Sequence, residues 1–567
     1  MNSTLPAIVA QNAVRRLPRP ALAALCLAYV MAGFWGRAPW KNADVTAFGY
    51  MMELAQGHTH WLNPLLAGMP PETDGLLAYW IGAWSILAAP SGWSPELVSR
   101  VPFVLMLCLT LVATWYGVYY LARSPKAQPV AFAFGGEARP TDYARALADG
   151  GLLALMACLG LARLSHEVTS YLTQLCCIAL TFYAVAASPY RRTAPLIAFA
   201  LGLGGLALSG APSIAPALGY GCAALMAVQA SAQTGEGRRH HLRAVAAMAA
   251  VTTGALALVL ALDLARWRVV LPDAAEARSL VRLLVWFAWP AWPLALLALW
   301  RWRQQLAHWR WPLHLSLPLW FALLSIVATF TTLPADRALL LGLPALATLA
   351  ALALPTLSRS LAALIDWFTL LFFTGAALII WIIWLAMQTG FPEQPAANVA
   401  RLAPGFRPDF SWLPLLCALA ASAVWAALVR WRVGRHPAAI WKSLVLPASG
   451  AALGWILLMT LWLPLLDYAL SYEPMVQGAR ALIGSPACVE EYGLSRAQVA
   501  AFQYQGGLRL QAAGKRPTCS WILVSREQLT SWRRHFDTSP WVFESTVWRP
   551  VEQREAVLLY RLGTGSE

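Results

Sequence analysis

Asp44 has the clearest chemical setting of any carboxylate in the sequence. It lies in a loop between two apolar segments, residues 37–100, and the basic residue Lys41 precedes it by three positions. A carboxylate held in such a loop is able to orient a hydroxyl group or to remove its proton as a general base. The alternative is a helix N-cap, because Asp44 precedes a stretch with helical apolar periodicity. Asp44 is our first candidate catalytic residue.

Glu167 is the second candidate catalytic residue. It ends the short polar stretch Arg163-Leu164-Ser165-His166-Glu167. It would supply a second carboxylate or help to hold a metal ion. The alternative is a structural ion pair with Arg163, four positions earlier on the same helical face.

Several arginines are candidates for binding a phosphate, because the planar guanidinium pairs with two phosphate oxygens at once. A basic group lies in one loop and consists of Arg266, Arg268, Arg278 and Arg282. Pairing with Asp273 and Glu276 in the same loop is the alternative for this group. The residues we predict to bind phosphate are Arg100, Arg266, Arg268, Arg337 and Lys41.

His58 and His60 flank Thr59 in the loop that carries Asp44. Imidazole is a common zinc ligand, but two histidines alone do not complete a zinc site. We therefore assign both histidines to substrate binding. No cofactor is predicted with certainty, and a divalent metal stays an alternative.

The elements that position these residues are membrane-spanning helices. Of the 567 residues 59% are hydrophobic and 12% are charged, whereas soluble domains have about 25% charged residues. Many apolar runs approach the roughly 20 residues that cross a hydrocarbon core. We predict thirteen spans, at residues 20–36, 101–122, 149–163, 168–188, 195–209, 212–231, 244–265, 282–300, 312–333, 338–354, 361–387, 412–430 and 443–466. Residues 76–90 are too short to span and are predicted to form an interfacial helix.

The distribution of Lys and Arg predicts the orientation of these spans. Basic residues are more frequent in the loops on the N-terminal side of the membrane, which indicates a cytoplasmic N-terminus. The loop 37–100 and residues 467–567 are then periplasmic in a bacterial inner membrane. Residues 467–567 change to alternating apolar runs, at 521–524, 541–543 and 556–560, which predict strands of a small α/β domain. A disulfide between Cys488 and Cys519 is compatible with this compartment.

Two classes of partner are disfavoured by the sequence. The formal charge of +15 is spread between apolar spans rather than gathered on one soluble face, so we expect no nucleic acid. Neither a Walker loop nor a G-x-G-x-x-G following a strand is present, so a nucleotide site is not expected.

The loop 37–100 carries a recognisable order of motifs: Trp40, then Asp44, then Glu53-Leu54, then Gly57-His58-Thr59-His60-Trp61-Leu62-Asn63-Pro64. This order resembles the lipid A aminoarabinose transferases and protein O-mannosyltransferases, which are membrane glycosyltransferases of the C-type fold. Tyr79-Trp80 matches the Tyr-Trp that opens the next helix of the family. Further similar segments are residues 163–167, residues 332–344 with Arg337, Tyr492-Gly493-Leu494, Phe502-Gln503-Tyr504 and Leu559-Tyr560-Arg561.

The resemblance implies a polytopic α-helical protein with residues 1–466 as the transferase domain and 467–567 as a periplasmic domain. It implies inverting transfer of a sugar from a polyprenyl-phosphate donor to lipid A, another lipid-linked glycan or a protein. Tyr79 and Asp74 would then contact the substrate, and membrane lipids would surround the spans.

The sequence departs from the family pattern at two lysines. Asp74 stands where the family has a lysine that contacts the carrier phosphate, and Ser209 stands at a second family lysine. An anion there weakens donor binding unless another cation or a metal compensates. Either arginines from other loops replace the lysines or Asp74 contacts a different group, and aminoarabinose becomes a poor candidate for the sugar. Two alternatives stay open: a flippase or transporter of the lipid carrier, and an inactive relative that binds lipid-linked sugar.

Overall fold

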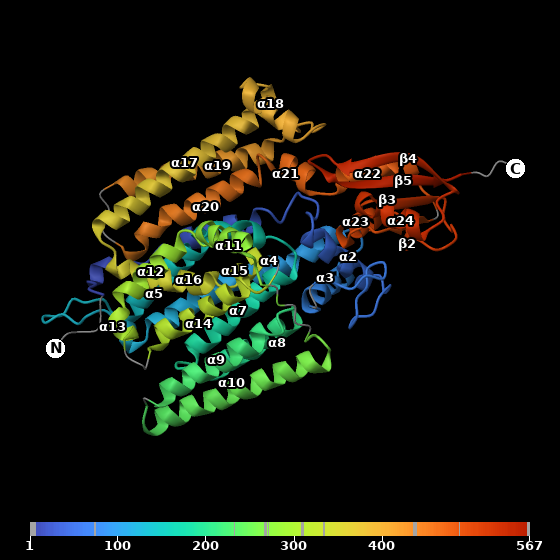
Figure 1. Ribbon diagram of the computed structural model, residues 1–567. Coiled ribbons are helices and arrows are strands. Elements are labelled where there is room, and N and C mark those ends of the chain that lie inside the picture. The colour runs from blue at the N-terminus through green and yellow to red at the C-terminus, as the bar shows by residue number, and fades with distance from the viewer. Residues whose placement is uncertain are drawn as a thin grey trace.

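A bundle of helices is followed by a small domain that contains a β-sheet (Figure 1). The structure is a computed structural model that describes residues 7–72, 75–231, 233–265, 269, 271–307, 311–332, 335–434, 439–486 and 488–563, with only the backbone at residues 553 and 554. The N-terminal end of the chain and the sheet domain lie at opposite ends of the bundle.

Seven helices of the described residues are long and apolar enough to cross a membrane. They are α4 (Pro95–Ala122), α7 (Ser170–Ala187), α9 (Ile214–Ser231), α10 (Gly235–Ala261), α17 (Arg359–Thr389), α19 (Trp412–Val433) and the continuous pair η4 (Ile440–Leu444) and α20 (Val445–Leu458). Local signals set their ends. α4 begins at Pro95, whose missing N–H costs nothing in a first turn, and α17 ends at Gly390, which has a φ of 77°.

The remaining bundle helices are shorter, and several are enclosed by their neighbours. α16, for example, is buried along its length and packs against α5, α12 and α14. Its ends are therefore set by packing rather than by the width of a bilayer. The bounds are α1 (Arg19–Met31), α5 (Pro140–Ala157), α6 (Leu159–Leu164), α8 (Thr193–Leu208), α13 (Arg303–Leu306), α14 (Leu313–Thr329), α15 (Ala335–Leu340), α16 (Leu343–Ala353), η1 (Gln11–Ala13), η2 (Pro125–Ala127) and η3 (Leu354–Thr356).

Helical structure lies at all thirteen predicted spans, but four of them are not single helices. The predicted span 443–466 covers the end of η4, all of α20 and the start of α21 (Leu463–Leu470). The predicted span 149–163 divides at Cys158 between α5 and α6, and 338–354 begins in α15 and continues in α16. The predicted span 282–300 is a broken pair, α11 (Ala274–Phe287) and α12 (Ala291–Arg301), bent by 86°. If this pair counts as one span, the described residues hold eight candidate spans by length and composition.

Three helices lie in the segments between spans. α2 (Ala43–Ala55) and α3 (Leu77–Leu87) form part of the loop 37–100, and α3 lies within the predicted interfacial helix. α18 (Glu393–Leu402) connects α17 and α19 (Figure 1). In the same view α2 and α3 lie at the end of the bundle that faces the sheet domain.

The C-terminal domain is a mixed five-stranded sheet with helices, as predicted. The strand order is β2-β1-β3-β5-β4, in which β1 is parallel to β2 and β3, and β5 is antiparallel to β3 and β4. The strands are β1 (Val489–Tyr492), β2 (Leu510–Ala512), β3 (Trp521–Ser525), β4 (Trp541–Arg549) and β5 (Glu552–Leu562). The helices are α21 (Leu463–Leu470), α22 (Glu473–Ile483), α23 (Arg496–Ala500), η5 (Ala501–Gln505), η6 (Arg526–Gln528) and α24 (Leu529–His535). The predicted disulfide between Cys488 and Cys519 is present beside the paired strands β1 and β3.

Close packing joins this domain to α2. A Cβ built on Gly49 would lie 2.7 Å from the Cβ of Ala500, so the two helices meet where only glycine fits. The Tyr504 hydroxyl also donates a hydrogen bond to the Glu53 carboxylate, at 2.7 Å.

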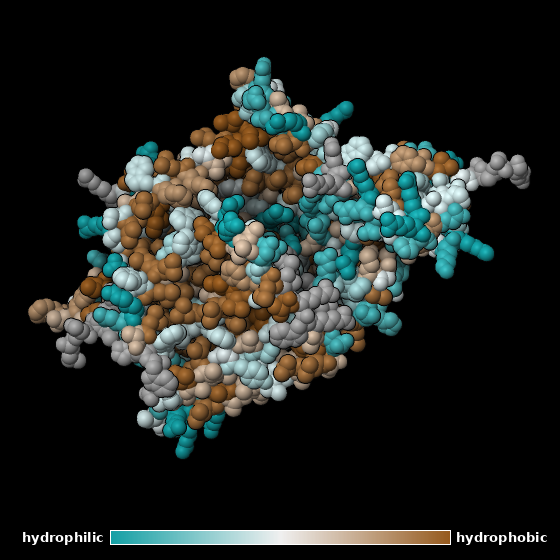
Figure 2. All heavy atoms as spheres, viewed as in Figure 1, coloured by the Kyte–Doolittle hydropathy of each residue, from teal (hydrophilic) through white to brown (hydrophobic). Residues whose placement is uncertain are grey.

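Figure 2 shows hydrophobic surface over much of the bundle and a more hydrophilic surface over the C-terminal domain. The fold thus brings a polar domain against the loop that carries Asp44.

Candidate active site

Asp44 lies in the first turn of α2 and its carboxylate is fully enclosed. One oxygen, Oδ2, accepts hydrogen bonds from Arg37 Nη1 at 2.5 Å and from the Trp40 backbone N–H at 3.2 Å. The other oxygen, Oδ1, accepts from the Val168 backbone N–H at 3.0 Å. The N-cap position of α2 is held by Asn42, so Asp44 does not have the alternative N-cap role. Asp44 instead connects the loop 37–100 to the loop after α6 through its bond with Val168.

Arg37 is the partner of Asp44 that the sequence reasoning missed. Besides Asp44, its guanidinium donates to the backbone oxygens of Gly33 and His166, at 2.7 and 2.9 Å. It also lies over the Trp40 ring, 4.5 Å from the centroid. Its closeness to Trp40 and Asp44 in the sequence was the available signal.

The charge state of Asp44 follows from this environment. Burial raises the pKa of the carboxyl, but the positive charges of Arg37 and Arg100 and the hydrogen bonds lower it by more. The resulting pKa lies below the ordinary value of an aspartate. Asp44 is therefore a carboxylate at neutral pH and a weak base.

Glu167 is buried next to this pair and has two basic partners. Arg337 Nη2 donates a hydrogen bond to Oε2 at 3.1 Å, and Arg163 Nε lies 3.8 Å from Oε1. The predicted pairing with Arg163 is therefore present, with a shorter contact to Arg337 beside it. Burial, assisted by the negative charge of Asp44, raises the pKa of Glu167 more than the two arginines lower it. The residues Asp44, Glu167 and Arg337 thus form one charged cluster.

Arg100 and Arg337 each have an N–H group without a hydrogen-bond partner in the part of the chain that the structure describes. Arg100 is 5% exposed and donates through Nη1 to the Phe34 backbone oxygen at 3.1 Å, whereas its buried Nη2 has no hydrogen-bond partner among the described residues. Arg337 lies over the Tyr171 ring, and its buried Nε has no partner there either. Unsatisfied buried donors cost free energy, so they mark places where a ligand oxygen would fit.

A cleft of about 570 Å³ lies between the loop 37–100 and the C-terminal domain. Arg100 and Glu96 of α4 line one wall, and Glu473 of α22 lines another. Asp467 of α21 also lines it, and its Oδ1 accepts from the Ala38 backbone N–H at 3.0 Å and from Trp40 Nε1 at 2.9 Å. The sequence reasoning did not single out Asp467, which follows a predicted span directly.

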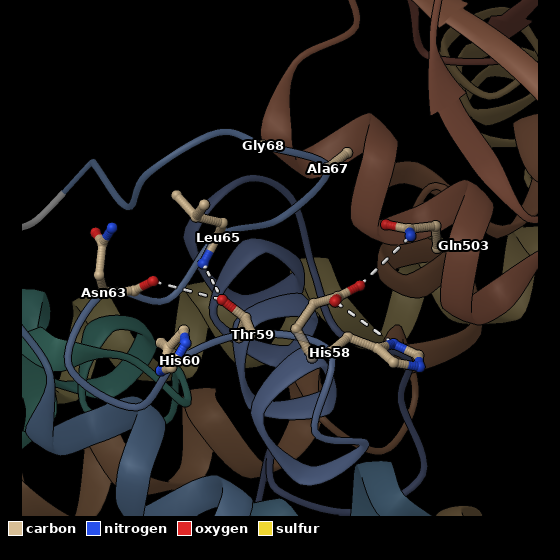
Figure 3. A pocket seen from close by; sticks show the side chains of 9 residues that line it. His58, Thr59, His60, Asn63, Leu65, Ala67, Gly68 and Gln503 are labelled. Carbon is tan, nitrogen blue, oxygen red and sulfur yellow. Dashed lines mark hydrogen bonds and ion pairs between the residues drawn. The ribbon is translucent and has the colours of Figure 1, made fainter.

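A second cavity, of about 510 Å³, contains both predicted histidines (Figure 3). His58 and His60 lie at its rim, and His58 Nδ1 is 3.6 Å from the Glu53 carboxylate. Gln503 of the π-helix η5 donates to the same carboxylate. In the described residues no group of three or more His, Cys, Asp or Glu side chains is arranged to hold a metal. The two histidines therefore share a cavity that is distinct from the charged cluster.

The other predicted site residues lie apart from Asp44 or are not described. Lys41 forms an ion pair with Glu552 of β5, so it holds the two domains together instead of facing the cluster. Tyr79 is buried, with its ring centroid 5.2 Å from that of Tyr50. Asp74, Arg266 and Arg268 lie outside the described residues.

The predicted basic residues Arg278 and Arg282 lie in α11, and this helix begins with a capping box at Asp273. Asp273 accepts from the backbone N–H groups of Ala275 and Glu276, and the Glu276 side chain accepts from the Asp273 backbone N–H. Both carboxylates therefore accept hydrogen bonds from backbone N–H groups at the start of α11. Arg278 donates to the Ala274 backbone oxygen.

The segments at which the family lysines are replaced meet in the structure. Gly75, which follows Asp74, approaches the Ser209 backbone so closely that a Cβ would lie 2.5 Å from its carbonyl carbon. The Leu76 backbone N–H donates to the Leu208 oxygen at 2.6 Å. The two departures from the family pattern therefore affect one place in the fold.

Comparisons with known proteins give a consistent result at the level of fold. No protein-family model matches the chain, and no curated protein matches it in sequence. The crystal structure of ArnT from Cupriavidus metallidurans in the apo state is similar, with a TM-score of 0.61 at 14% identity, covering 95% of this chain and 97% of ArnT. The structure of the same ArnT bound to undecaprenyl phosphate has a TM-score of 0.58 at 14% identity, covering 97% and 99%. The predicted resemblance is confirmed for the fold: over nearly its whole length the chain folds as ArnT does, a multi-span membrane protein with a C-terminal sheet domain.

Proposed function

We propose that this protein transfers a sugar from a polyprenyl-phosphate donor to an acceptor, with inversion at the anomeric carbon. The observation that carries the proposal is the pair of arginines, Arg100 and Arg337, that flank the carboxylates, because each has a buried N–H group without a hydrogen-bond partner among the described residues. The fold supports it, because the similar ArnT has been crystallised with undecaprenyl phosphate.

Arg100 and Arg337 bind the donor phosphate in this proposal. When the sugar–phosphate bond breaks, negative charge grows on the departing phosphate, and donors already in place stabilise that charge most in a site from which water is excluded. These two arginines take over from the lysines that are replaced by Asp74 and Ser209. The polyprenyl tail lies between helices of the bundle.

Asp44 acts in this proposal by positioning the arginines. Its hydrogen bonds orient Arg37, and the positive charges of Arg37 and Arg100 hold the pKa of Asp44 below the ordinary value of an aspartate. Of the two roles predicted for Asp44, proton removal is disfavoured by this low pKa, and direct contact with the acceptor is disfavoured because both of its oxygens accept hydrogen bonds from the protein. Glu167 has the corresponding relation to Arg337.

The remaining parts of the proposal concern placement. The chain lies in a bacterial inner membrane with thirteen spans, its N-terminus cytoplasmic and residues 467–567 periplasmic. The acceptor, which is lipid A, another lipid-linked glycan or a protein, reaches the site from the periplasmic side. The predicted substrate contacts of His58, His60 and Tyr79 stay part of the proposal; the two histidines line a cavity, whereas Tyr79 is buried.

The test is a gene deletion followed by mass spectrometry of lipopolysaccharide, glycolipids and surface proteins. A sugar that disappears and returns with the wild-type gene supports transfer, and an unchanged glycan profile contradicts it. Complementation with Arg337→Ala is expected to restore less than about a tenth of the sugar, because removal of one charge-stabilising donor costs about 100-fold or more in rate. Arg303→Ala, which changes an exposed arginine, is the matched control. Movement of labelled carrier across liposomes without sugar transfer would establish the flippase alternative.

A further inference from the structure

The Asp467 carboxylate lines the cleft and has one hydrogen-bonded oxygen and one oxygen without a partner among the described residues. Oδ1 is fixed by the Ala38 N–H and by Trp40 Nε1. Oδ2 has no hydrogen bond or ion pair with any described residue, and the side chain lines the cleft. Burial raises the pKa of Asp467 more than these hydrogen bonds and the nearby Arg37 and Arg100 lower it. The group is thus oriented, open to a ligand and more basic than an ordinary aspartate.

Asp44 differs from Asp467 in each of these respects. Both of its oxygens accept hydrogen bonds from the protein, its side chain is 3% exposed, and it lines neither of the two cavities described above. To accept a proton it would have to give up its contact with Arg37, which would leave a buried charge without its partner. Asp467 accepts a proton without any such loss.

The cleft is lined for a hydroxyl-rich group that carries no net charge. The arginines Arg37, Arg100 and Arg480 are matched in number by the carboxylates Glu96, Asp467 and Glu473. The lining also contains the amide of Gln505, of which neither the oxygen nor the nitrogen has a partner among the described residues. Carboxylates, amides and guanidinium groups around one cavity offer both donors and acceptors, as sugar hydroxyls require.

We propose, on the basis of the proposed transferase function, that this cleft binds a sugar of the acceptor and that Asp467 is the general base. The acceptor's hydroxyl oxygen attacks the anomeric carbon of the donor, and its proton passes to Asp467 Oδ2. The bond between the anomeric carbon and the phosphate oxygen breaks, and its electron pair leaves with polyprenyl phosphate. The product is a glycoside, in which the new bond joins two sugars.

The experiment uses purified full-length protein and detergent-treated membranes of the deletion strain, which supply the native donor and acceptor. Asp467→Asn retains a carbonyl oxygen for the Ala38 and Trp40 hydrogen bonds but does not accept a proton. Its initial rate of product formation, followed by mass spectrometry, is expected to fall about 100-fold or more. Binding of undecaprenyl phosphate by the same variant is expected to stay within about twofold of wild type, whereas Arg337→Ala weakens it. Asp537→Asn, at an exposed turn, is the matched control.

The pH profile separates a base from a merely structural residue. The rate of the wild type is expected to rise with pH through one ionisation, and the residual rate of Asp467→Asn to lack that rise. The charged or titratable groups that face Asp467 across the cleft are Arg37, Arg100, Glu96, Glu473, Arg480 and Tyr504. If Glu96→Gln removes the rise and Asp467→Asn does not, the proposed base is wrong.

Further experimental outcomes test this inference separately from the proposed function. A product that mild acid splits at a sugar–phosphate linkage, or full activity of Asp467→Asn, would overturn the inference and leave sugar transfer intact. A wild-type protein that neither forms product nor binds undecaprenyl phosphate would overturn both.

Discussion

Arg37 and Asp44 form a buried ion pair whose partners also hold several backbone groups in place. Removal of one partner leaves the other charged and enclosed, which costs about 3–5 kcal/mol for a buried pair. Asp44→Ala and Arg37→Ala are each expected to lower the unfolding midpoint in mild detergent. The double variant is expected to lose less than the sum of the two, and additive losses would contradict a coupled pair.

The lowered pKa of Asp44 predicts an acid-sensitive contribution to stability. Because the folded-state pKa lies below the unfolded value of about 3.9, the stabilisation is fully present above that pH and is lost as the pH falls through the folded-state pKa. Thermal unfolding of the wild type between pH 6 and about pH 3 should therefore show a fall in midpoint that is smaller in Asp44→Asn. Equal slopes for both proteins would show that another group is responsible.

Only some residues of the candidate site could be predicted from the sequence. Asp44, Glu167, Arg100 and Arg337 were singled out because each is a charged residue in or beside a loop between apolar spans, and the structure gathers these four. Asp467 was missed because nothing in the local sequence shows that it meets Trp40, 427 positions earlier. The ion pair of Lys41 was not foreseen for the same reason, since its partner Glu552 lies in the last strand, and its predicted role in phosphate binding stays a prediction.

At the level of elements, apolar length located the helices but not their breaks. The segment 282–300 is apolar enough for one span, yet its first half, α11, is amphipathic and packs across α6 and α15. The number of apolar residues in a segment does not show whether the helix is bent there. The strands β3, β4 and β5 were predictable from alternation, whereas β2 has only three residues and shows no alternating pattern that predicts it.

The contact between α2 and α23 allows a sharp test of element packing. Alanine normally stabilises an exposed helix position relative to glycine by about 1 kcal/mol. Gly49→Ala is expected to do the opposite, because its Cβ would meet Ala500 at 2.7 Å and push the C-terminal domain away. Limited proteolysis should then cut the variant faster between α20 and α22. Gly254→Ala, in α10 with nothing within 4 Å of the added carbon, is the matched control and should digest like the wild type.

The sheet domain lies at one end of the bundle beside α2 and α3 (Figure 1), and the cleft is lined by residues of this domain together with residues of α4 and of the loop 37–100. With the proposed topology this end faces the periplasm. Alkaline phosphatase fused after residue 567 is therefore expected to be active, and a fusion in the segment 123–139 inactive. The reverse pattern would place the site on the cytoplasmic side and would contradict a periplasmic acceptor.

The disulfide gives an independent check of the same orientation. Cys488 and Cys519 are joined, while the other seven cysteines are free. In cells grown without reductant, alkylation after denaturation is expected to label seven thiols and to leave this pair unlabelled. Nine labelled thiols would indicate a reducing compartment for the domain.

The cleft draws its walls from the first and the last parts of the chain, with Arg37 and Arg100 on one side and Glu473 and Gln505 on the other. During synthesis these two sets of residues are made at different times, because nearly the whole bundle is synthesised after the first set and before the second. A nascent or truncated chain therefore has Arg37 and Arg100 but lacks the residues of α21, α22 and η5 that complete the cleft. On the proposed function, sugar transfer would therefore depend on residues 467–567, which complete the cleft.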